Sequence, residues 1–199
     1  MKNILHVTSS PRGDESISTQ LGRAIVSELI SKNPGSELVE IDLVNNPFPH
    51  LDGKQTTALR TPTDLLTEEQ KQLLERSNEA VRQLFTADHI IISLPLHNFG
   101  IASVLKSWLD NVIRAGHTFS YSSEGPKGLL SGKKVHIAIA TGGIYSDGPM
   151  AALDFAVPYL ESIFKFIGIT DFEVYRAEGL GIPALQEKAL EKAIESIAV

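Results

Sequence analysis

Five short apolar runs alternate with longer segments of helical periodicity along the chain of 199 residues. The runs cover residues 4–7, 38–43, 89–94, 135–140 and 172–174. The third run is apolar at successive positions, as is typical of strands that are buried on both faces of a sheet. Because parallel strands need long crossover connections, this alternation predicts a parallel sheet with helices on both faces, an α/β fold.

Helical periodicity fills most of the segments between these runs. Between Ser18 and Lys32, apolar residues recur at three- and four-residue spacing, the pattern of an amphipathic helix. Thr67 and Gln70 are spaced as a capping box, in which each side chain bonds the other residue's backbone amide at a helix start. We expect helices over 18–32, 67–86, 103–115 and 150–167, and a last helix with Pro183 near its first turn.

Two segments lack such a pattern. Residues 45–66 contain three prolines, which predicts a long irregular excursion, and residues 116–132 form a glycine-rich loop. The chain has no internal repeat, and its length suits one domain. We therefore expect residues 1–199 to fold as a single domain.

Composition excludes several function classes. The chain has no cysteine, which removes disulfides, thiolate metal sites and cysteine nucleophiles. A net charge of -6 argues against nucleic acid as a partner, since such binding needs a basic face. No apolar stretch approaches the roughly 20 residues of a membrane span, and the run at 4–7 is too short for a signal-peptide core. No membrane association is expected, and the cytoplasm is the expected location.

The first polar loop has the composition of a phosphate site. Ligands of open parallel sheets bind beyond the carboxyl ends of the strands, so the loops after the first, third and fourth runs are the places to search. Residues 9–19 carry Arg12 and five hydroxyl side chains ahead of a helix, namely Ser9, Ser10, Ser16, Ser18 and Thr19. Free amides at a helix start attract an anion, which predicts a phosphate monoester. The alternative is that Ser16 or Ser18 only caps the helix.

The other two loops suit a flat ring. In residues 95–100, Asn98 and Phe99 offer edge hydrogen bonds and a stacking surface, although Phe99 in an ordinary loop packs into the core instead. Gly142 and Gly143 allow a ligand close to the backbone, or serve a tight turn. Together the three loops match the phosphate and ring of flavin mononucleotide (FMN).

The sequence motifs of other nucleotide-binding, hydrolase and metal sites are absent from the chain. No G-x-G-x-x-G follows the first strand, residues 128–133 fail the P-loop spacing, and there is no G-x-S-x-G elbow. The six histidines show no metal-binding spacing, so no metal is expected, and His6 and His136 are interpreted as hydrogen-bonded core residues. Asp110 and Arg114, one helical turn apart, are interpreted as a surface ion pair.

At these same residues the sequence resembles the bacterial FMN-dependent NADH-azoreductases, also described as FMN-dependent NADH:quinone oxidoreductases. The resemblance covers nearly the whole chain and rests on Ser16-x-Ser18, Asn98-Phe99, the loop AGHTFSYSSEGPKGLLSGKK, Gly142-Gly143 and FIGITD at 166–171. It implies a flavodoxin-like three-layer sandwich whose five-stranded parallel sheet has the order 2-1-3-4-5. It also implies a homodimer with FMN near the interface.

The resemblance assigns roles to particular residues. Those implied to hold FMN are Ser10, Ser16, Ile17, Ser18, Leu96, His97, Asn98, Phe99, Ala140, Thr141, Gly142 and Gly143. Phe119 and Tyr121 are implied to line the substrate position, with packing inside their loop as the alternative. The chain departs from the family where His97 replaces a Tyr and Thr141 a basic residue, which bears on flavin potential and substrate preference.

The resemblance also implies a reaction. NADH delivers a hydride to the flavin and leaves, and a quinone or azo compound then takes two electrons at the same place, in ping-pong order. Bound FMN carries this chemistry, so no catalytic protein residue is expected. Two alternatives have related folds. A flavodoxin-type electron carrier would serve protein partners, and a response-regulator-like domain would need an acidic cluster that Thr8-Ser9-Ser10 lacks.

Overall fold

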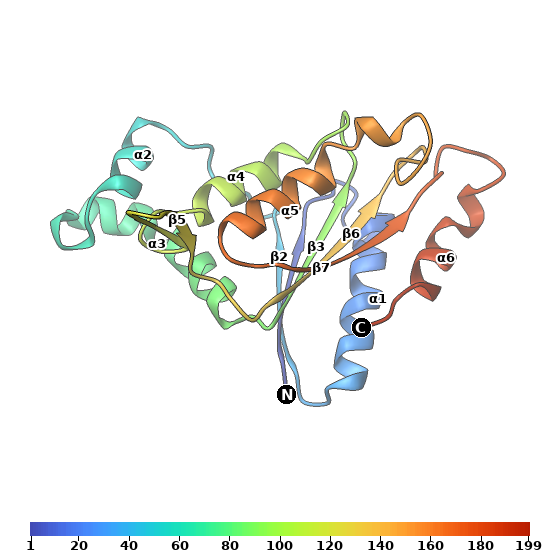
Figure 1. Ribbon diagram of the computed structural model, residues 1–199, viewed down its shortest axis with the longest axis horizontal. Helices are drawn as coiled ribbons and strands as arrows, with labels where there is room; N and C mark the ends of the chain where they lie inside the picture. The colour runs from blue at the N-terminus through green and yellow to red at the C-terminus, as the bar shows by residue number, and fades with distance from the viewer.

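The protein is built on one five-stranded parallel sheet, seen in a computed structural model that describes residues 1–199 (Figure 1). Its strands are β1 (Asn3–Thr8), β2 (Glu37–Asp42), β3 (His89–Pro95), β6 (Lys134–Ala140) and β7 (Asp171–Ala177). They lie in the order β2-β1-β3-β6-β7, and every neighbouring pair is parallel. Counted along the chain, this is the expected order 2-1-3-4-5, so the α/β prediction is confirmed.

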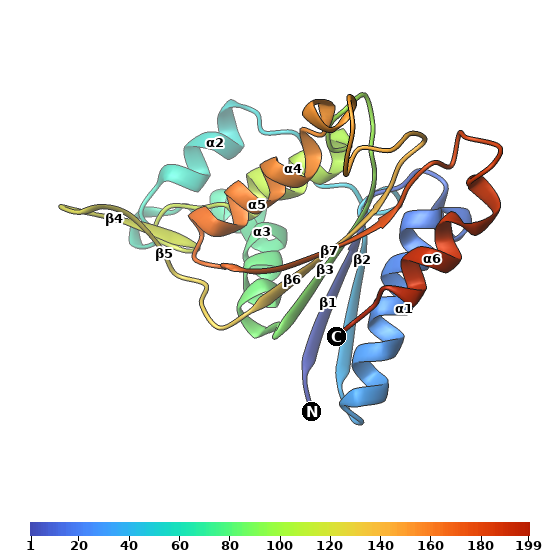
Figure 2. The ribbon, with the colours of Figure 1, turned by 45° about the vertical axis from the view of Figure 1, so that its right-hand side comes forward.

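Helices cover both faces of the sheet, giving three layers (Figures 1 and 2). One face carries α1 (Ile17–Lys32) and α6 (Ala189–Glu195), and the other carries α3 (Glu68–Thr86), α4 (Ser103–Val112) and α5 (Ala156–Phe166). Strand side chains alternate between the two faces, so each face has its own apolar core. The core under α3, α4 and α5 is the larger and includes the fully buried Trp108.

The capping box at the start of α3 forms as its spacing predicts. Thr67 Oγ1 accepts a hydrogen bond from the Gln70 amide at 3.2 Å, and the Thr67 amide donates to Gln70 Oε1 at 3.0 Å. These two bonds satisfy amides that a helix start otherwise leaves open. The expected helix over 67–86 is confirmed.

The segment 45–66 is more regular than its prolines indicated. It contains α2 (Gly53–Arg60) and the 3₁₀ turn η2 (Thr63–Leu65). Asp52 begins α2, since its carboxylate accepts from the Gln55 amide at 2.7 Å. The expectation of a wholly irregular excursion was wrong because the prolines flank this short helix and do not interrupt it.

Three more boundaries differ from expectation. The glycine-rich loop contains an antiparallel hairpin of β4 (Phe119–Ser122) and β5 (Gly125–Gly128). The helix expected over 150–167 is a 3₁₀ turn, η3 (Ala151–Leu153), followed by α5, because the Asp154 carboxylate accepts from the Ala156 and Val157 amides at 3.0 Å and starts a new helix. The last helix begins only at Ala189, after η4 (Gln186–Lys188), so Pro183 precedes it.

None of the helices combines the length and the apolar character that a membrane-spanning helix needs. The structure also holds no group of three or more histidine and acidic side chains arranged to bind a metal ion.

Candidate functional site

The fold brings the three polar loops to one edge of the sheet. They follow β1, β3 and β6, which are adjacent and parallel, so their carboxyl ends point the same way. Backbone hydrogen bonds join the strand ends: the Ser9 amide donates to Ser93 O at 3.1 Å, and the Leu96 amide donates to Ala140 O at 2.9 Å. The loops therefore start from a fixed common base.

The loop after β1 presents a helix start that lacks a side-chain cap. It passes through the 3₁₀ turn η1 (Gly13–Glu15) and enters α1 at Ser16. The Ser16 hydroxyl caps no amide and instead lies 3.0 Å from the Ser18 hydroxyl, both side chains being buried. The first-turn amides of α1 and the positive end of its dipole are therefore available to an anion.

Thr19, in the same first turn, adds an independent indication of a ligand. Its side chain is buried, yet Oγ1 has no hydrogen-bond partner. A buried hydroxyl without a partner costs free energy, and a bound anion would remove that cost. Sequence reasoning counted this hydroxyl in the loop but assigned it no role. The polar groups here fit a phosphate.

The loop after β3 is a tight turn with unusual backbone angles. His97 and Gly100 exchange backbone hydrogen bonds at 2.9 and 3.0 Å, and the residues between them have positive φ, 47° at Asn98 and 67° at Phe99. Asn tolerates this region, but for Phe it is strained, by about 1–3 kcal/mol. Phe99 is 41% exposed and does not pack into the core. Its ring instead lies 6.4 Å from that of Tyr145.

The loop after β6 presents open backbone. Ala140 and Thr141 are buried, and the Thr141 hydroxyl donates to Gly143 O at 2.7 Å. A Cβ on Gly142 would meet no atom within 4 Å, so a planar ligand has access to this peptide. The Gly181 amide holds Gly142 O at 2.8 Å. The two glycines thus form a turn that hydrogen bonds hold in place, and they leave one side of that turn open to a ligand.

Sequence reasoning missed the residues that support this loop. Arg176 Nη2 donates to Asp154 Oδ2 at 2.7 Å, and the Glu178 carboxylate accepts from the amides of Tyr145 and Ser146 at 2.8 and 2.9 Å. Arg176 Nη1 also lies 3.6 Å from Glu178 Oε1. Both ends of the 145–154 segment are therefore tied to the end of β7. The only sequence signal was a charged pair at the end of an apolar strand.

Phe119 and Tyr121 lie apart from the three loops. They belong to the β4–β5 hairpin, which projects from the body of the protein in Figure 2. Phe119 is buried against Phe166, with ring centroids 4.6 Å apart, whereas Tyr121 is 72% exposed. Both residues line a hollow of about 810 Å³, whose walls include α4 and the segment 59–63 but no residue of the three loops.

A second hollow lies between the turn after β3 and the hollow that Phe119 and Tyr121 line. It has a volume of about 580 Å³ and runs from Gly100, beside the turn after β3, along α5. Lys106 and Tyr159 line both hollows, so the two adjoin at α4 and α5, and together they are called the groove of α4 and α5. The structure therefore relates Phe119 and Tyr121 to the turn through this groove and not by direct contact.

Asp110 and Arg114 do not form the expected surface pair. Asp110 pairs with Lys106, while Arg114 is buried and donates to Ser77 Oγ at 3.0 Å and Asn78 Oδ1 at 2.7 Å. Helix α4 ends at Val112, two residues before Arg114, so the helical spacing assumed for the pair does not apply. Burial lowers the pKa of the Arg114 guanidinium.

The two strand histidines are buried and hydrogen-bonded, as expected. His6 Nε2 lies 2.8 Å from Ser93 Oγ and its Nδ1 lies 2.9 Å from Glu40 Oε2. Burial lowers the pKa of His6. Burial, together with the neighbouring His89 at 3.0 Å, lowers the pKa of His136 to about 4. Both imidazoles are therefore neutral near pH 7.

Comparison with known proteins identifies the relatives of this chain. Residues 2–199 match the family described as having a flavodoxin-like fold. The chain is 50% identical over 194 residues to an FMN-dependent NADH:quinone oxidoreductase of Rhizobium leguminosarum bv. trifolii, covering 97% of this chain and 95% of that protein. It is 47% identical over 203 residues to FMN-dependent NADH:quinone oxidoreductase 1 of Rhizobium etli, covering 100% and 99%.

Solved structures agree. A Bacillus anthracis azoreductase superposes with a TM-score of 0.89 at 31% identity, covering 98% of this chain and 96% of that one. An FMN-dependent NADH-azoreductase of Bacillus anthracis, solved in complex with FMN, gives a TM-score of 0.86 at 29% identity, covering 98% and 97%. With its fold and nearly its whole length matched, this chain belongs to the FMN-dependent NADH:quinone oxidoreductase family of flavodoxin-like proteins.

Proposed function

We propose that this protein is an FMN-dependent NADH:quinone oxidoreductase that also cleaves azo bonds by reduction. The observation that carries the proposal is the helix start of α1, whose buried Ser16 and Ser18 hydroxyls bond each other and whose Thr19 hydroxyl has no partner. It lies at the same sheet edge as an exposed aromatic turn and an open glycine backbone. The names of the relatives give the same cofactor and donor.

In this proposal each loop holds one part of FMN. Ser10, Ser16, Ser18 and the first-turn amides of α1, including that of Ile17, bind the phosphate and ribityl chain. The isoalloxazine ring lies between the other two loops and contacts Leu96, His97, Asn98, Phe99, Ala140, Thr141, Gly142 and Gly143. Bound FMN would supply the chemistry, accepting a hydride from NADH and passing two electrons to the acceptor.

In this proposal the chain's own residues orient the flavin ring and enclose it. Phe99, with Tyr145 behind it, offers an aromatic wall, and the pinned peptide at Gly142 offers hydrogen-bonding groups at a fixed position. None of these residues is assigned a proton transfer. NADH and the quinone or azo acceptor occupy one place in turn, which gives ping-pong kinetics.

We further infer a homodimer, built along the groove of α4 and α5. Tyr121 and Phe155, at 72% and 59% exposure, are large apolar side chains at the margins of this groove. A partner subunit seated there would cover both residues and would border the turn at Phe99. In this arrangement Phe119 and Tyr121 belong to the substrate surroundings of the assembled dimer. The expected place of action is the cytoplasm.

Reconstitution followed by turnover tests the proposal. The purified protein is expected to be yellow, or to turn yellow with FMN, and to oxidise NADH with menadione or methyl red in the absence of any partner protein. Double-reciprocal plots with menadione should be parallel. Protein that stays colourless after incubation with FMN would refute the flavin assignment. Protein that binds FMN but leaves NADH untouched would instead favour the electron-carrier alternative.

A further inference from the structure

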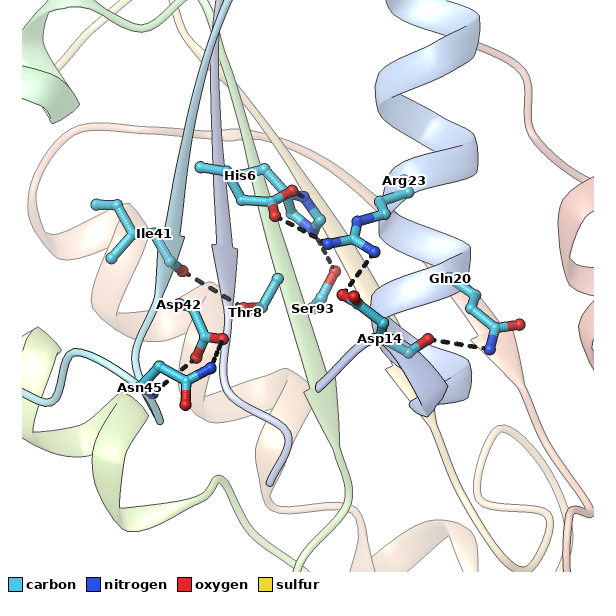
Figure 3. A network of polar contacts seen from close by, with 10 residues as sticks. His6, Thr8, Asp14, Gln20, Arg23, Ile41, Asp42, Asn45 and Ser93 are labelled. Atoms are coloured by element: carbon cyan, nitrogen blue, oxygen red, sulfur yellow. Dashed lines mark hydrogen bonds and ion pairs between the residues drawn. The ribbon is translucent and has the colours of Figure 1, made fainter. Parts of the chain in front are cut away.

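A chain of polar contacts runs from Asp14, in the loop between β1 and α1, through Arg23 to His6 and Ser93 in the sheet (Figure 3). Arg23, on α1, bonds Asp14 Oδ1 at 2.7 Å and Glu40 Oε1 at 3.0 Å. Glu40 in turn bonds the buried His6, whose other ring nitrogen bonds Ser93 Oγ. The backbone oxygen of Ser93 then accepts hydrogen bonds from both the amide and the hydroxyl of Ser9, each at 3.1 Å.

The charges along this chain matter because of where Asp14 lies. Asp14 belongs to η1, two residues before Ser16, at the helix start that the proposed function gives to the FMN phosphate. A carboxylate beside a phosphate site weakens anion binding unless a cation offsets it. Arg23 is the cation that contacts Asp14, and it also contacts Glu40.

The hydrogen bonds also fix the shape of the loop. Gln20 Nε2 donates to Asp14 O at 3.2 Å, so α1 holds η1 through both Gln20 and Arg23. Glu40 stays ionised because, although burial alone would raise its pKa, the bonds from Arg23 and His6 bring the pKa below its usual value. Arg23 therefore has a charged partner on either side, one in the loop and one on β2.

We propose that Arg23 is a positioning residue for the flavin phosphate, acting through Asp14: it neutralises that carboxylate and holds η1 so that the start of α1 stays open to the anion. This inference rests on the proposed function. It predicts that Arg23 affects the binding of flavins that carry a phosphate and has no effect on binding of the ring.

Riboflavin, which has the same ring and ribityl chain but no phosphate, provides the test. Apoprotein is titrated with FMN and with riboflavin at low salt, with quenching of flavin fluorescence as the readout. Wild type should bind FMN more tightly than riboflavin. In Arg23→Gln the Kd for FMN should rise about three- to fivefold, the range set by breaking one partly exposed ion pair, while the Kd for riboflavin stays unchanged. The rise should shrink at high salt.

Three further variants separate positioning from a general effect. Arg23→Lys keeps the charge and should restore part of the FMN affinity. Arg82→Gln breaks a comparable surface pair with Glu79 on α3, away from the loop, and should change neither Kd. In an Asp14→Asn background, Arg23→Gln should have a smaller effect than in wild type, because the partner it acts through is gone.

Four outcomes would overturn the proposal. Equal weakening of FMN and riboflavin by Arg23→Gln would show a purely structural role. Unchanged FMN binding in Arg23→Gln, with wild type still preferring FMN, would show that Arg23 does not act on the phosphate. If wild type binds both flavins equally, the phosphate contributes nothing to binding and there is no effect for Arg23 to support. A wild type that binds neither flavin refutes the proposed function, and this inference with it.

Discussion

Gly22 offers a sharp test of how closely α1 packs on the sheet. It is buried inside α1, on the side of the helix that faces the His6–Ser93 hydrogen bond. A Cβ at this position would lie 1.9 Å from Ser93 Oγ and 2.5 Å from His6 Nε2. Neither contact is sterically possible, and both side chains are buried in the sheet. Gly22→Ala must therefore displace either the helix or the hydrogen-bonded pair.

The expected loss of stability in Gly22→Ala follows from three contributions to the free energy of unfolding. Alanine is favoured over glycine inside a helix by about 1 kcal/mol, which stabilises the variant. Forcing an extra carbon into a packed site costs about 1–3 kcal/mol. Separating His6 from Ser93 leaves buried polar groups unpaired, at about 1–3 kcal/mol. The sum is a net loss of roughly 3 kcal/mol in the free energy of unfolding, a large share of the stability of a domain this size.

Urea unfolding, followed by circular dichroism, measures this loss, and Gly53→Ala is the matched control. Gly53 is also helical, at the start of α2, but its Cβ direction is open to solvent, so its substitution should change stability by less than about 0.5 kcal/mol. Because α1 follows the loop proposed to bind the FMN phosphate, Gly22→Ala should also weaken FMN binding. A Gly22→Ala variant as stable as Gly53→Ala would refute the reasoning.

Three further substitutions test separate parts of the account. His136 is neutral when folded, with a pKa of about 4, but takes a proton near pH 6.5 when unfolded, so stability should fall as pH drops from about 6.5 towards 4. His136→Gln should flatten that slope by up to about 1.4 kcal/mol per pH unit in urea titrations, and an unchanged slope would contradict it. Asp154→Ala removes the cap of α5 and leaves Arg176 without its closest partner, so unfolding should become easier by about 3 kcal/mol, whereas a loss below about 1 kcal/mol would show that the pair is not coupled to the fold. Thr19→Val removes the unpartnered buried hydroxyl; apoprotein should melt no lower than wild type while FMN binds more weakly, and unchanged FMN affinity would mean that this hydroxyl does not contact the flavin.

The sheet was predictable because its signals are local. Runs such as 89–94 are apolar on both faces, and the capping box at Thr67 marks a helix start within four residues. The order of the strands came instead from the resemblance. The hairpin at 119–128 and the short helix α2 were missed, because their few residues carry no clear period and their turns depend on contacts with α3 and α5.

The site was predictable as three loops but not as a geometry. Hydroxyls and glycines are visible in the sequence, whereas the positive φ of Phe99 contradicts the ordinary preference of that residue and follows from the turn between His97 and Gly100. The support from Arg176 and Glu178 joins residues 22 to 33 positions apart in the chain. Such long-range pairing leaves no periodic signal. The wrong pairing of Asp110 with Arg114 has another origin, because α4 ends at Val112 and Asp110 instead pairs with Lys106 one helical turn earlier.

Anaerobic spectroscopy of the FMN-loaded protein tests the central claim most directly. The account predicts that NADH alone bleaches the flavin absorbance band, with one NADH consumed per FMN, and that menadione added afterwards restores the band without any other protein present. A flavin band that NADH leaves unchanged, in protein shown to hold FMN, would contradict the assignment of this chain as an NADH:quinone oxidoreductase.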